Sequence, residues 1–390
     1  MTIDDVIANL LIRGTCGYQV GELPAPAYDE PSDSASRPKI GLAVESMRRH
    51  MTDEGWQLFQ GLETADYRLC GNFHAGQETF TNDPPLYRIR ANDTASILEL
   101  MNPSTLVIQD KREWIGRTAG GPKSFDPREM FTNVSALKVR DDVFKLTVLK
   151  DAQSDELLHV EAANEIGCQA WVCYYHPRIV KHLAPFVRQR HLVRTWHSVD
   201  ADAVPTYSPE YFDINAKKLK PRDGCLLSGA LSGAYPFRKR IMDWHHRGEL
   251  SGGRNGSTMC IHLPHPGYGR GGCKTPEFLK TLAEYKVAVC TSSVYGYALR
   301  KIVEATACGC RVITNLPEDE VMPHIDANLV RVSENILPGQ MRDLLKRLID
   351  GYDPSFQEAM AGVCKSWYDY RAVGKRLAAD IETLRRDYNG

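Results

Sequence analysis

The chain has 390 residues, of which 43% are apolar and 25% are charged, and its formal net charge is -1. This length exceeds one ordinary core and suits two domains, and the mixed composition excludes wholesale disorder. The near-neutral charge excludes a strongly basic, general nucleic-acid binder, although a local basic face remains open.

The eleven cysteines are scattered along the chain and form no paired zinc-binding pattern. Scattered single cysteines are typical of a reducing compartment, so we expect a cytoplasmic protein without a structural metal. The sequence shows no signal peptide and no apolar run of the ~18 residues that a membrane span requires. We therefore expect no membrane span.

The first half of the chain predicts an acceptor-side domain over residues 39–210. Residues 1–38 precede it as a short amphipathic helix and a linker rich in proline, serine and acidic residues. Apolar runs then predict strands at residues 40–45, 105–109, 143–149, 170–174 and 192–196, with helices at 159–166 and 179–188. Continuous apolar strands separated by helices indicate parallel βαβ units.

A less regular stretch, residues 208–224, predicts the domain boundary, and a second alternating series fills residues 211–365. Its expected strands lie at 225–228, 259–263, 287–291, 311–314 and 329–332, and its expected helices at 236–246, 275–284, 299–308 and 338–351. A C-terminal helix is expected within residues 366–390. The predicted fold class is α/β, with two Rossmann-like domains that face a cleft and a C-terminal helix.

The loop after the first strand of the second half is a candidate ligand site, because parallel sheets bind ligands beyond the carboxyl ends of their strands. Small residues there permit close approach of a ligand to the backbone, and the candidate contacts are Gly229, Ser232, Gly233 and Tyr235. Pro236 begins the next helix, whose first turn places Arg238 where amides and a cation attract phosphate. The alternative is a plain turn with solvated arginines.

The loop after the third strand of that half is a second candidate, with Ser293, Gly296 and Tyr297 before a helix. Arg300 and Lys301 lie in the first helical turn, where the helix dipole disfavours cations, so an anionic partner would explain them. Glu304 follows within one turn. The alternative for Glu304 is an intrahelical pair with Lys301.

Three segments together resemble the donor-site region of GT-B glycosyltransferases, especially the group-1 and CgeB-like branches. They are SSVYGYALRKIVEATACGCRVIT at residues 292–314, SGALSGAYPFRKR at 228–240 and LVRTWHSVD at 192–200. The resemblance implies that Glu304 binds the nucleotide ribose, that Arg238 holds the diphosphate and that His197 faces the acceptor and the sugar. Many members carry another glutamate where this chain has Gly296.

Weaker candidates follow other strands. His265 and Tyr268 lie in a glycine-rich loop that could clamp the base or a phosphate, or could be an ordinary surface loop. On the acceptor side, Asp110 and Arg112 could point into the cleft or form a solvated charged turn. His176 closes another strand of that half.

Two further patterns are ambiguous. Asp200 and Asp202 match a two-acid metal signature of another glycosyltransferase class, but the context differs and chance matches are common. A basic cluster could serve a nucleic-acid backbone or could be a solvated helix face; it comprises His182, Arg188, Arg190, His191 and Arg194, with Phe186 and Trp196 interleaved.

The resemblance implies a metal-independent glycosyltransferase whose co-substrate is a nucleoside diphosphate sugar and which needs no further cofactor. Arg238, with Lys301 or Arg300, would neutralise the diphosphate leaving group. His197 would accept the acceptor's proton or donate a hydrogen bond to the sugar. The acceptor stays open between glycans, small molecules, proteins and hydroxymethylated DNA bases. The alternatives are a nucleotide-sugar epimerase or hydrolase of the same fold, or a non-catalytic relative that binds nucleotide sugars.

Overall fold

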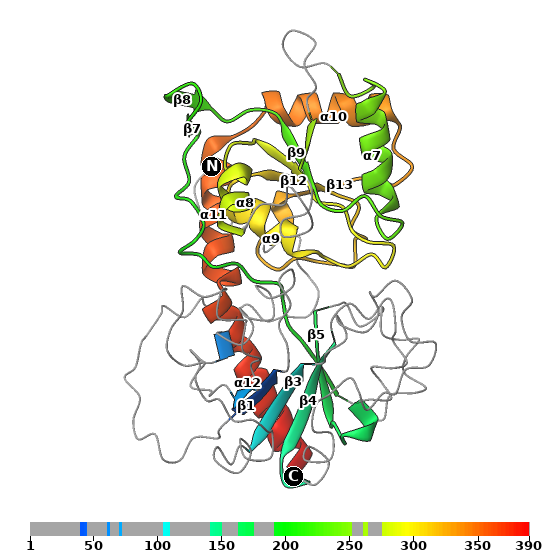
Figure 1. Ribbon diagram of the computed structural model, residues 1–390, viewed down its shortest axis with the longest axis vertical. Coiled ribbons are helices and arrows are strands. Elements are labelled where there is room, and N and C mark those ends of the chain that lie inside the picture. The colour runs from blue at the N-terminus through cyan, green and yellow to red at the C-terminus, as the bar shows by residue number, and fades with distance from the viewer. Residues whose placement is uncertain are drawn as a thin grey trace.

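The chain folds into two parallel sheets and ends in two long helices (Figure 1). The computed structural model describes residues 40–44, 61–62, 70–71, 104–109, 141–149, 163–174, 191–251, 260–263 and 275–389. The expected α/β class with parallel sheets and a C-terminal helix is confirmed.

The first sheet has six described strands, in the order β2-β1-β3-β4-β5-β6, and every pairing is parallel. The strands are β1 (Ile40–Val44), β2 (Cys70–Gly71), β3 (Thr105–Gln109), β4 (Phe144–Leu149), β5 (Ala170–Cys173) and β6 (His191–Arg194). Strand β5 is buried at all four positions, as expected for a strand covered on both faces. Five of these strands match the predicted apolar runs to within two residues, whereas β2 was not predicted.

The second sheet has five described parallel strands in the order β10-β9-β11-β12-β13. They are β9 (Cys225–Ser228), β10 (Cys260–Leu263), β11 (Val287–Val289), β12 (Arg311–Thr314) and β13 (Leu329–Arg331). The chain runs from β9 outward to β10 and then returns to the other side of β9 for β11. The direction of winding therefore reverses between β9 and β11, which is where an open parallel sheet forms its ligand crevice.

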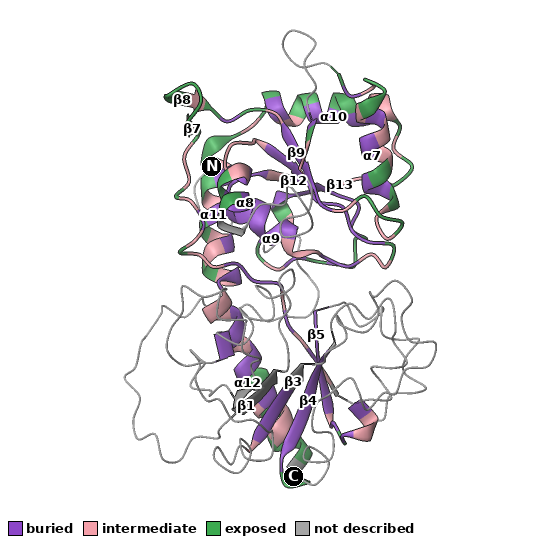
Figure 2. Ribbon diagram, viewed as in Figure 1, coloured by how far each residue is buried: buried purple, intermediate pink, exposed green. Residues whose placement is uncertain are grey.

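Helices cover both faces of the second sheet (Figure 2). They are α7 (Pro236–His246), α8 (Thr275–Leu282), α9 (Arg300–Ala307), α10 (Pro338–Asp350) and α11 (Pro354–Tyr368). Helices α7 and α10 share one apolar cluster with the sheet, and α8, α9 and α11 share the other. The crevice is lined by two loops, one between β9 and α7 and one between β11 and α9. Each loop is held by a strand and a helix that pack in the core.

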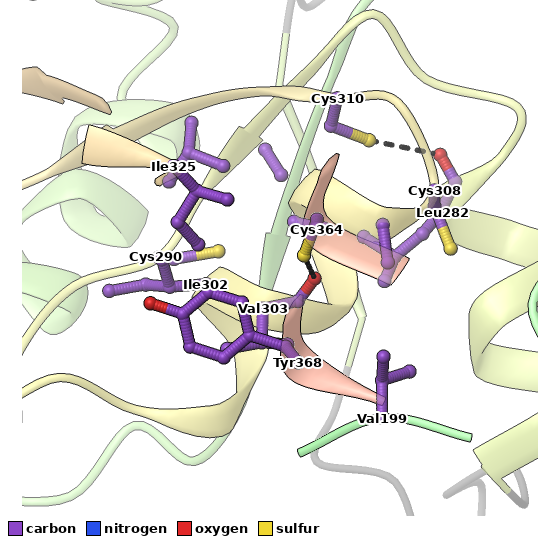
Figure 3. Packing of buried hydrophobic residues seen from close by; sticks show 14 of the residues in the cluster. Val199, Leu282, Cys290, Ile302, Val303, Cys308, Cys310, Ile325, Cys364 and Tyr368 are labelled. Carbon is purple, nitrogen blue, oxygen red and sulfur yellow. Dashed lines mark hydrogen bonds between the residues drawn. The ribbon is translucent and has the colours of Figure 1, made fainter. Parts of the chain in front are cut away.

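The core under α9 is rich in cysteine (Figure 3). The Cys364 thiol on α11 donates to the Val303 carbonyl on α9 at 3.4 Å, and the Cys310 thiol donates to the Leu282 carbonyl at 3.2 Å. Burial raises the pKa of Cys310 to about 12, so this thiol stays protonated. These thiols therefore act as small apolar groups that also satisfy backbone carbonyls.

The C-terminal helix α12 (Tyr370–Asn389) runs back to the first sheet, as Figure 1 shows. It contacts β6 and packs closely on Gly61. A methyl group at Gly374 would overlap the Gly61 backbone, and one at Gly61 would overlap the Tyr370 carbonyl of the same helix. The ring of Tyr388 lies 5.4 Å from that of Phe144 in β4. Helix α11, which leads into α12, was not predicted from the sequence.

Residues 208–224 are not an irregular stretch, which corrects the prediction for that segment. They contain an antiparallel hairpin of β7 (Glu210–Asp213) and β8 (Lys218–Pro221). The turn is stabilised by Asp213, whose Oδ1 accepts from the backbone of Asn215 at 2.8 Å and of Ala216 at 2.9 Å. The proposed boundary at residues 210/211 falls at this hairpin and stays a prediction, as do the other domain limits.

Candidate active site

The turn after β9 brings two cations together. Gly229 has φ +114, a conformation that favours glycine. A Cβ atom there would lie 2.4 Å from Nη1 of Arg238 and 3.3 Å from Cε of Lys301. The backbone at Gly229 therefore leaves room for a guanidinium and an ammonium group at the crevice between β9 and β11.

Arg238 ties the two loops of the crevice together. It is 1% exposed, its Nε donates to Oγ1 of Thr291 at 3.1 Å, and its Nη1 donates to the Ala230 carbonyl at 3.0 Å. Its guanidinium also lies 4.1 Å from the ring centre of Tyr235, and burial lowers its pKa. Arg238 thus has a structural role in addition to the diphosphate contact that the sequence predicts.

Lys301 is the less satisfied of the two cations. Its side chain is 8% exposed, and its ammonium lies 5.9 Å from the ring centre of Phe278. No described residue offers its Nζ a hydrogen-bond acceptor. Burial lowers the pKa of Lys301 to about 8, with repulsion from Arg238 and Arg300 adding to the effect and Glu304 opposing it.

Glu304 pairs with Arg300 on the same helix face, with Nε and Oε1 3.1 Å apart. This corrects the pairing of Glu304 with Lys301 that we weighed from the sequence. Both partners are largely buried, at 16% and 7% side-chain exposure. Lys301 thus lies near two other cations, Arg238 and Arg300, while the Glu304 carboxylate near it is already paired with Arg300. Among these four described side chains, the buried charge is positive in excess.

The two crevice loops are also joined through their backbones. The Val294 amide in the loop after β11 donates to the Ala234 carbonyl in the loop after β9 at 2.9 Å. Within the loop after β11, the Ser293 hydroxyl accepts from the Tyr295 amide at 3.2 Å. Gly296 has φ +64, a backbone conformation that favours glycine. Tyr297 is 3% exposed and belongs to the packing beneath the loop.

The loop after β9 is more open. Its Ser232 carbonyl accepts from the Tyr235 amide at 2.9 Å, and a methyl group at Gly233 would meet no atom of the described residues within 4 Å. Packing within the described part of the chain therefore does not require a glycine at position 233.

His197 contacts residues that follow a strand of each sheet. Its ring stacks on Tyr174, which follows β5, with centroids 4.8 Å apart and planes 16° apart. The imidazole also makes a hydrogen bond with the backbone of Ala298, just before α9. The structure therefore brings His197 beside the loop that leads into α9, and its role toward the acceptor and the sugar stays a prediction.

Burial lowers the pKa of His197 to about 3, with repulsion from Arg300 adding to the shift. The imidazole is therefore neutral at physiological pH and a weaker base than a solvent-exposed histidine. This corrects the expectation of an imidazole that titrates near neutrality. The lowered pKa favours the second expected role of His197, a hydrogen bond to the sugar, which stays a prediction.

Sequence reasoning missed Glu320. It is 0% exposed, and its Oε1 accepts from Nη2 of Arg194 at 2.8 Å and from the Ala298 amide at 3.2 Å. Arg194 stands on β6 and Ala298 on the loop before α9, so this carboxylate joins the two halves of the site. The guanidinium of Arg194 also lies 3.9 Å from the ring centre of Trp196, so Arg194 is not a solvated member of a nucleic-acid face.

Other candidates separate into two groups. Arg371 engages both aspartates of the two-acid pattern, with Nη2 3.5 Å from Asp200 and 2.5 Å from Asp202. No cluster of His, Cys, Asp or Glu suited to a metal ion occurs in the described part of the chain. Several predicted contacts lie outside the described residues; these are Asp110, Arg112, His176, His265 and Tyr268.

Comparison with known proteins identifies the fold as that of GT-B glycosyltransferases. No family model matches the chain, and no curated protein matches its sequence. A sucrose-phosphate synthase from Thermosynechococcus elongatus superposes with a TM-score of 0.53 at 12% identity, over 89% of this chain and 99% of that one.

Two further structures give the same result. A glycosyltransferase from Rickettsia africae has a TM-score of 0.53 at 12% identity, over 90% of this chain and 99% of its own. AviGT4, a glycosyltransferase involved in avilamycin A biosynthesis, has a TM-score of 0.50 at 11% identity, over 90% and 98% of the two chains. At these identities the likeness shows the fold, and the chemistry has to be argued from the site.

Proposed function

We propose that this protein is a glycosyltransferase that moves a sugar from a nucleoside diphosphate sugar to an acceptor hydroxyl. The observation that carries the proposal is the excess of buried positive charge at the crevice between β9 and β11. Arg238 and Lys301 meet at Gly229, while the described carboxylate near Lys301, that of Glu304, pairs with Arg300.

Buried cations without a counterion are costly, so the site favours an anion of more than one charge. A diphosphate supplies such charge and fits the crevice position that parallel sheets use for nucleotides. Lys301 has an ammonium free to donate hydrogen bonds, and two of the five N–H groups of Arg238 remain beyond those bonded to Thr291 and Ala230.

In the proposed reaction, the bond between the sugar's anomeric carbon and the diphosphate oxygen breaks. A bond from the acceptor oxygen to that carbon forms, the hydroxyl proton passes to a base or to solvent, and the nucleoside diphosphate departs. Arg238 and Lys301 stabilise the charge that develops on the leaving oxygen, which lowers the barrier. We propose that these cations do this without a divalent metal.

Glu304 accepts the ribose hydroxyls in this proposal, while Arg300 holds its carboxylate in place. Neutral His197 hydrogen-bonds the transferring sugar. The Glu304 segment, with Ala305 and Gly309 in the spacing of the motif, supports a place in the group-1 or CgeB-like branch. The eight cysteines whose side chains the structure describes are buried and unpaired, which supports a cytoplasmic location.

The test has two stages. A panel of nucleoside diphosphates and their sugars is first screened by thermal shift, because a ligand of the folded state raises its apparent stability. The best nucleotide sugar is then incubated with and without a mixture of candidate acceptors, and products are analysed by mass spectrometry.

A glycosylated product that needs an acceptor supports transfer. An altered sugar nucleotide without any acceptor would indicate an epimerase, and free sugar would indicate a hydrolase. Binding without any product would indicate a non-catalytic relative. Loss of activity in EDTA that Mg²⁺ or Mn²⁺ restores would refute the metal-independent mechanism.

A further inference from the structure

The β7–β8 hairpin exposes a concentration of apolar side chains. Phe212 is 60% exposed, Ile214 is 80% exposed and Leu219 is 62% exposed. Phe212 and Leu219 are directly paired across the two strands, and Ile214 lies at the turn. Scattered exposed apolar residues need no explanation, but three within eight residues on one hairpin form a patch.

The two faces of the hairpin differ. Tyr211 and Asp213, which alternate with Phe212 along β7, are half-buried. Tyr211 also lies near Glu284, just after α8. At its base, the 2% exposed Arg222 donates to the Ser208 carbonyl at 2.5 Å and to the Cys308 carbonyl at 2.6 Å. The hairpin is therefore anchored to the core and presents its apolar face outward, at a corner of the molecule (Figures 1 and 2).

The charges on the hairpin favour a negatively charged partner. Asp213 pairs with Lys220 and also accepts two turn amides, so this carboxylate is already neutralised. Lys217 and Lys218 are exposed at the turn, and neither has an ion pair within the described ranges. The remaining acid of the two strands, Glu210, stands at the opposite end from the turn.

We propose that this hairpin docks the protein on an anionic lipid surface, with Phe212, Ile214 and Leu219 inserted among the headgroups. Membrane surfaces attract apolar side chains flanked by lysines, through burial and through charge. A stable protein interface buries roughly 800 Å² on each partner, which exceeds what three side chains on a two-stranded hairpin offer. The proposal is independent of the transfer reaction.

The test measures co-sedimentation of the full chain with vesicles of phosphatidylcholine alone and with vesicles containing phosphatidylserine. We expect binding to the anionic vesicles that weakens as salt rises. The double variant Lys217→Glu/Lys218→Glu should lower the partition coefficient by more than twentyfold, since each lysine near such a surface contributes about fivefold. Phe212→Ser should lower it by about tenfold.

Leu337→Ser serves as the matched control, because Leu337 is 61% exposed at the start of α10, away from the hairpin. This variant should bind vesicles like the wild type. In Ile214→Trp, the added indole fluorescence should shift to the blue with anionic vesicles.

Three results would overturn the proposal. The first is that the protein binds neither kind of vesicle. The second is that Leu337→Ser loses as much vesicle binding as Phe212→Ser does. The third is that sedimentation velocity shows a soluble dimer, which Phe212→Ser dissociates. The last result would assign the patch to a second copy of the chain.

Discussion

Replacing Lys301 with methionine should stabilise the ligand-free protein while weakening its function. Methionine keeps the unbranched apolar stem that packs beside Phe278 and Gly229 but removes the ammonium group. The ammonium is buried beside two other cations and has no acceptor among the described residues. Its charge is therefore a cost to the empty site and a benefit only when an anion is bound.

The magnitude follows from the lowered pKa of Lys301. A change from 10.5 to about 8 on folding corresponds to roughly 3 kcal/mol, an upper limit for the stability gained by removing the charge. The folded state releases this proton at a lower pH than the unfolded chain does. The cost is therefore present in full below about pH 8, and it disappears as pH rises toward 10.5.

The assay compares the Tm of wild type and Lys301→Met from pH 7 to pH 9, and their affinities for the nucleoside diphosphate selected by the panel. The variant's Tm should be higher at pH 7, with the difference shrinking above pH 8. Its affinity should be 10–100-fold lower, as for loss of a charged hydrogen bond.

Lys239→Met, which removes an exposed lysine paired with Asp243, is the matched control and should change neither quantity appreciably. The reasoning about Lys301 fails if Lys301→Met lowers the Tm at pH 7 and binds the nucleotide like the wild type.

Three other substitutions test the remaining parts of the site. Gly229→Ala should lower both the Tm and nucleotide affinity, because its Cβ would displace Arg238; retained affinity would show that this guanidinium is not needed. Glu304→Gln should weaken binding of the nucleoside by about 1–3 kcal/mol in calorimetry, yet leave affinity for pyrophosphate almost unchanged. His197→Ala should keep nucleotide affinity and lower transfer by about 10²-fold, and the wild-type rate should show no titration of His197 between pH 5 and 8, because its pKa is about 3. A rate break near pH 6.5 that vanishes in His197→Ala would contradict the neutral assignment.

Local signals in the sequence were sufficient for most of the second sheet. Helix α7 has the predicted limits because Pro236 suits the first helical turn, and its apolar face, with Phe237 and Ile241, alternates with basic residues. Helix α11 also carries a local signal, since Asp353 accepts from the Ser355 and Phe356 amides as an N-cap. That helix was therefore predictable and was overlooked.

The missed parts of the site depend on contacts between distant residues. Glu320 follows two exposed acidic residues, Glu318 and Asp319, and nothing in the local pattern distinguishes it from them. Its carboxylate can be buried because it pairs with Arg194, which lies 126 positions away in the sequence. The choice of Arg300 over Lys301 as the partner of Glu304 is of the same kind, because both spacings are compatible with one helix face. Burial of Lys301 against the β9 turn decides between them.

The contacts around Glu320 connect the two halves of the site. Its carboxylate holds the Ala298 amide, and the backbone of Ala298 in turn bonds the imidazole of His197. Arg194, three residues before His197, completes a closed loop of contacts through the same carboxylate. A buried ion pair contributes little net stability, because desolvation offsets most of the attraction. Its effect here is positional, since the end of β6 and the start of α9 cannot shift relative to each other without leaving a buried charge unpaired. The residue proposed to face the sugar is thereby set in register with the cations proposed to hold the diphosphate.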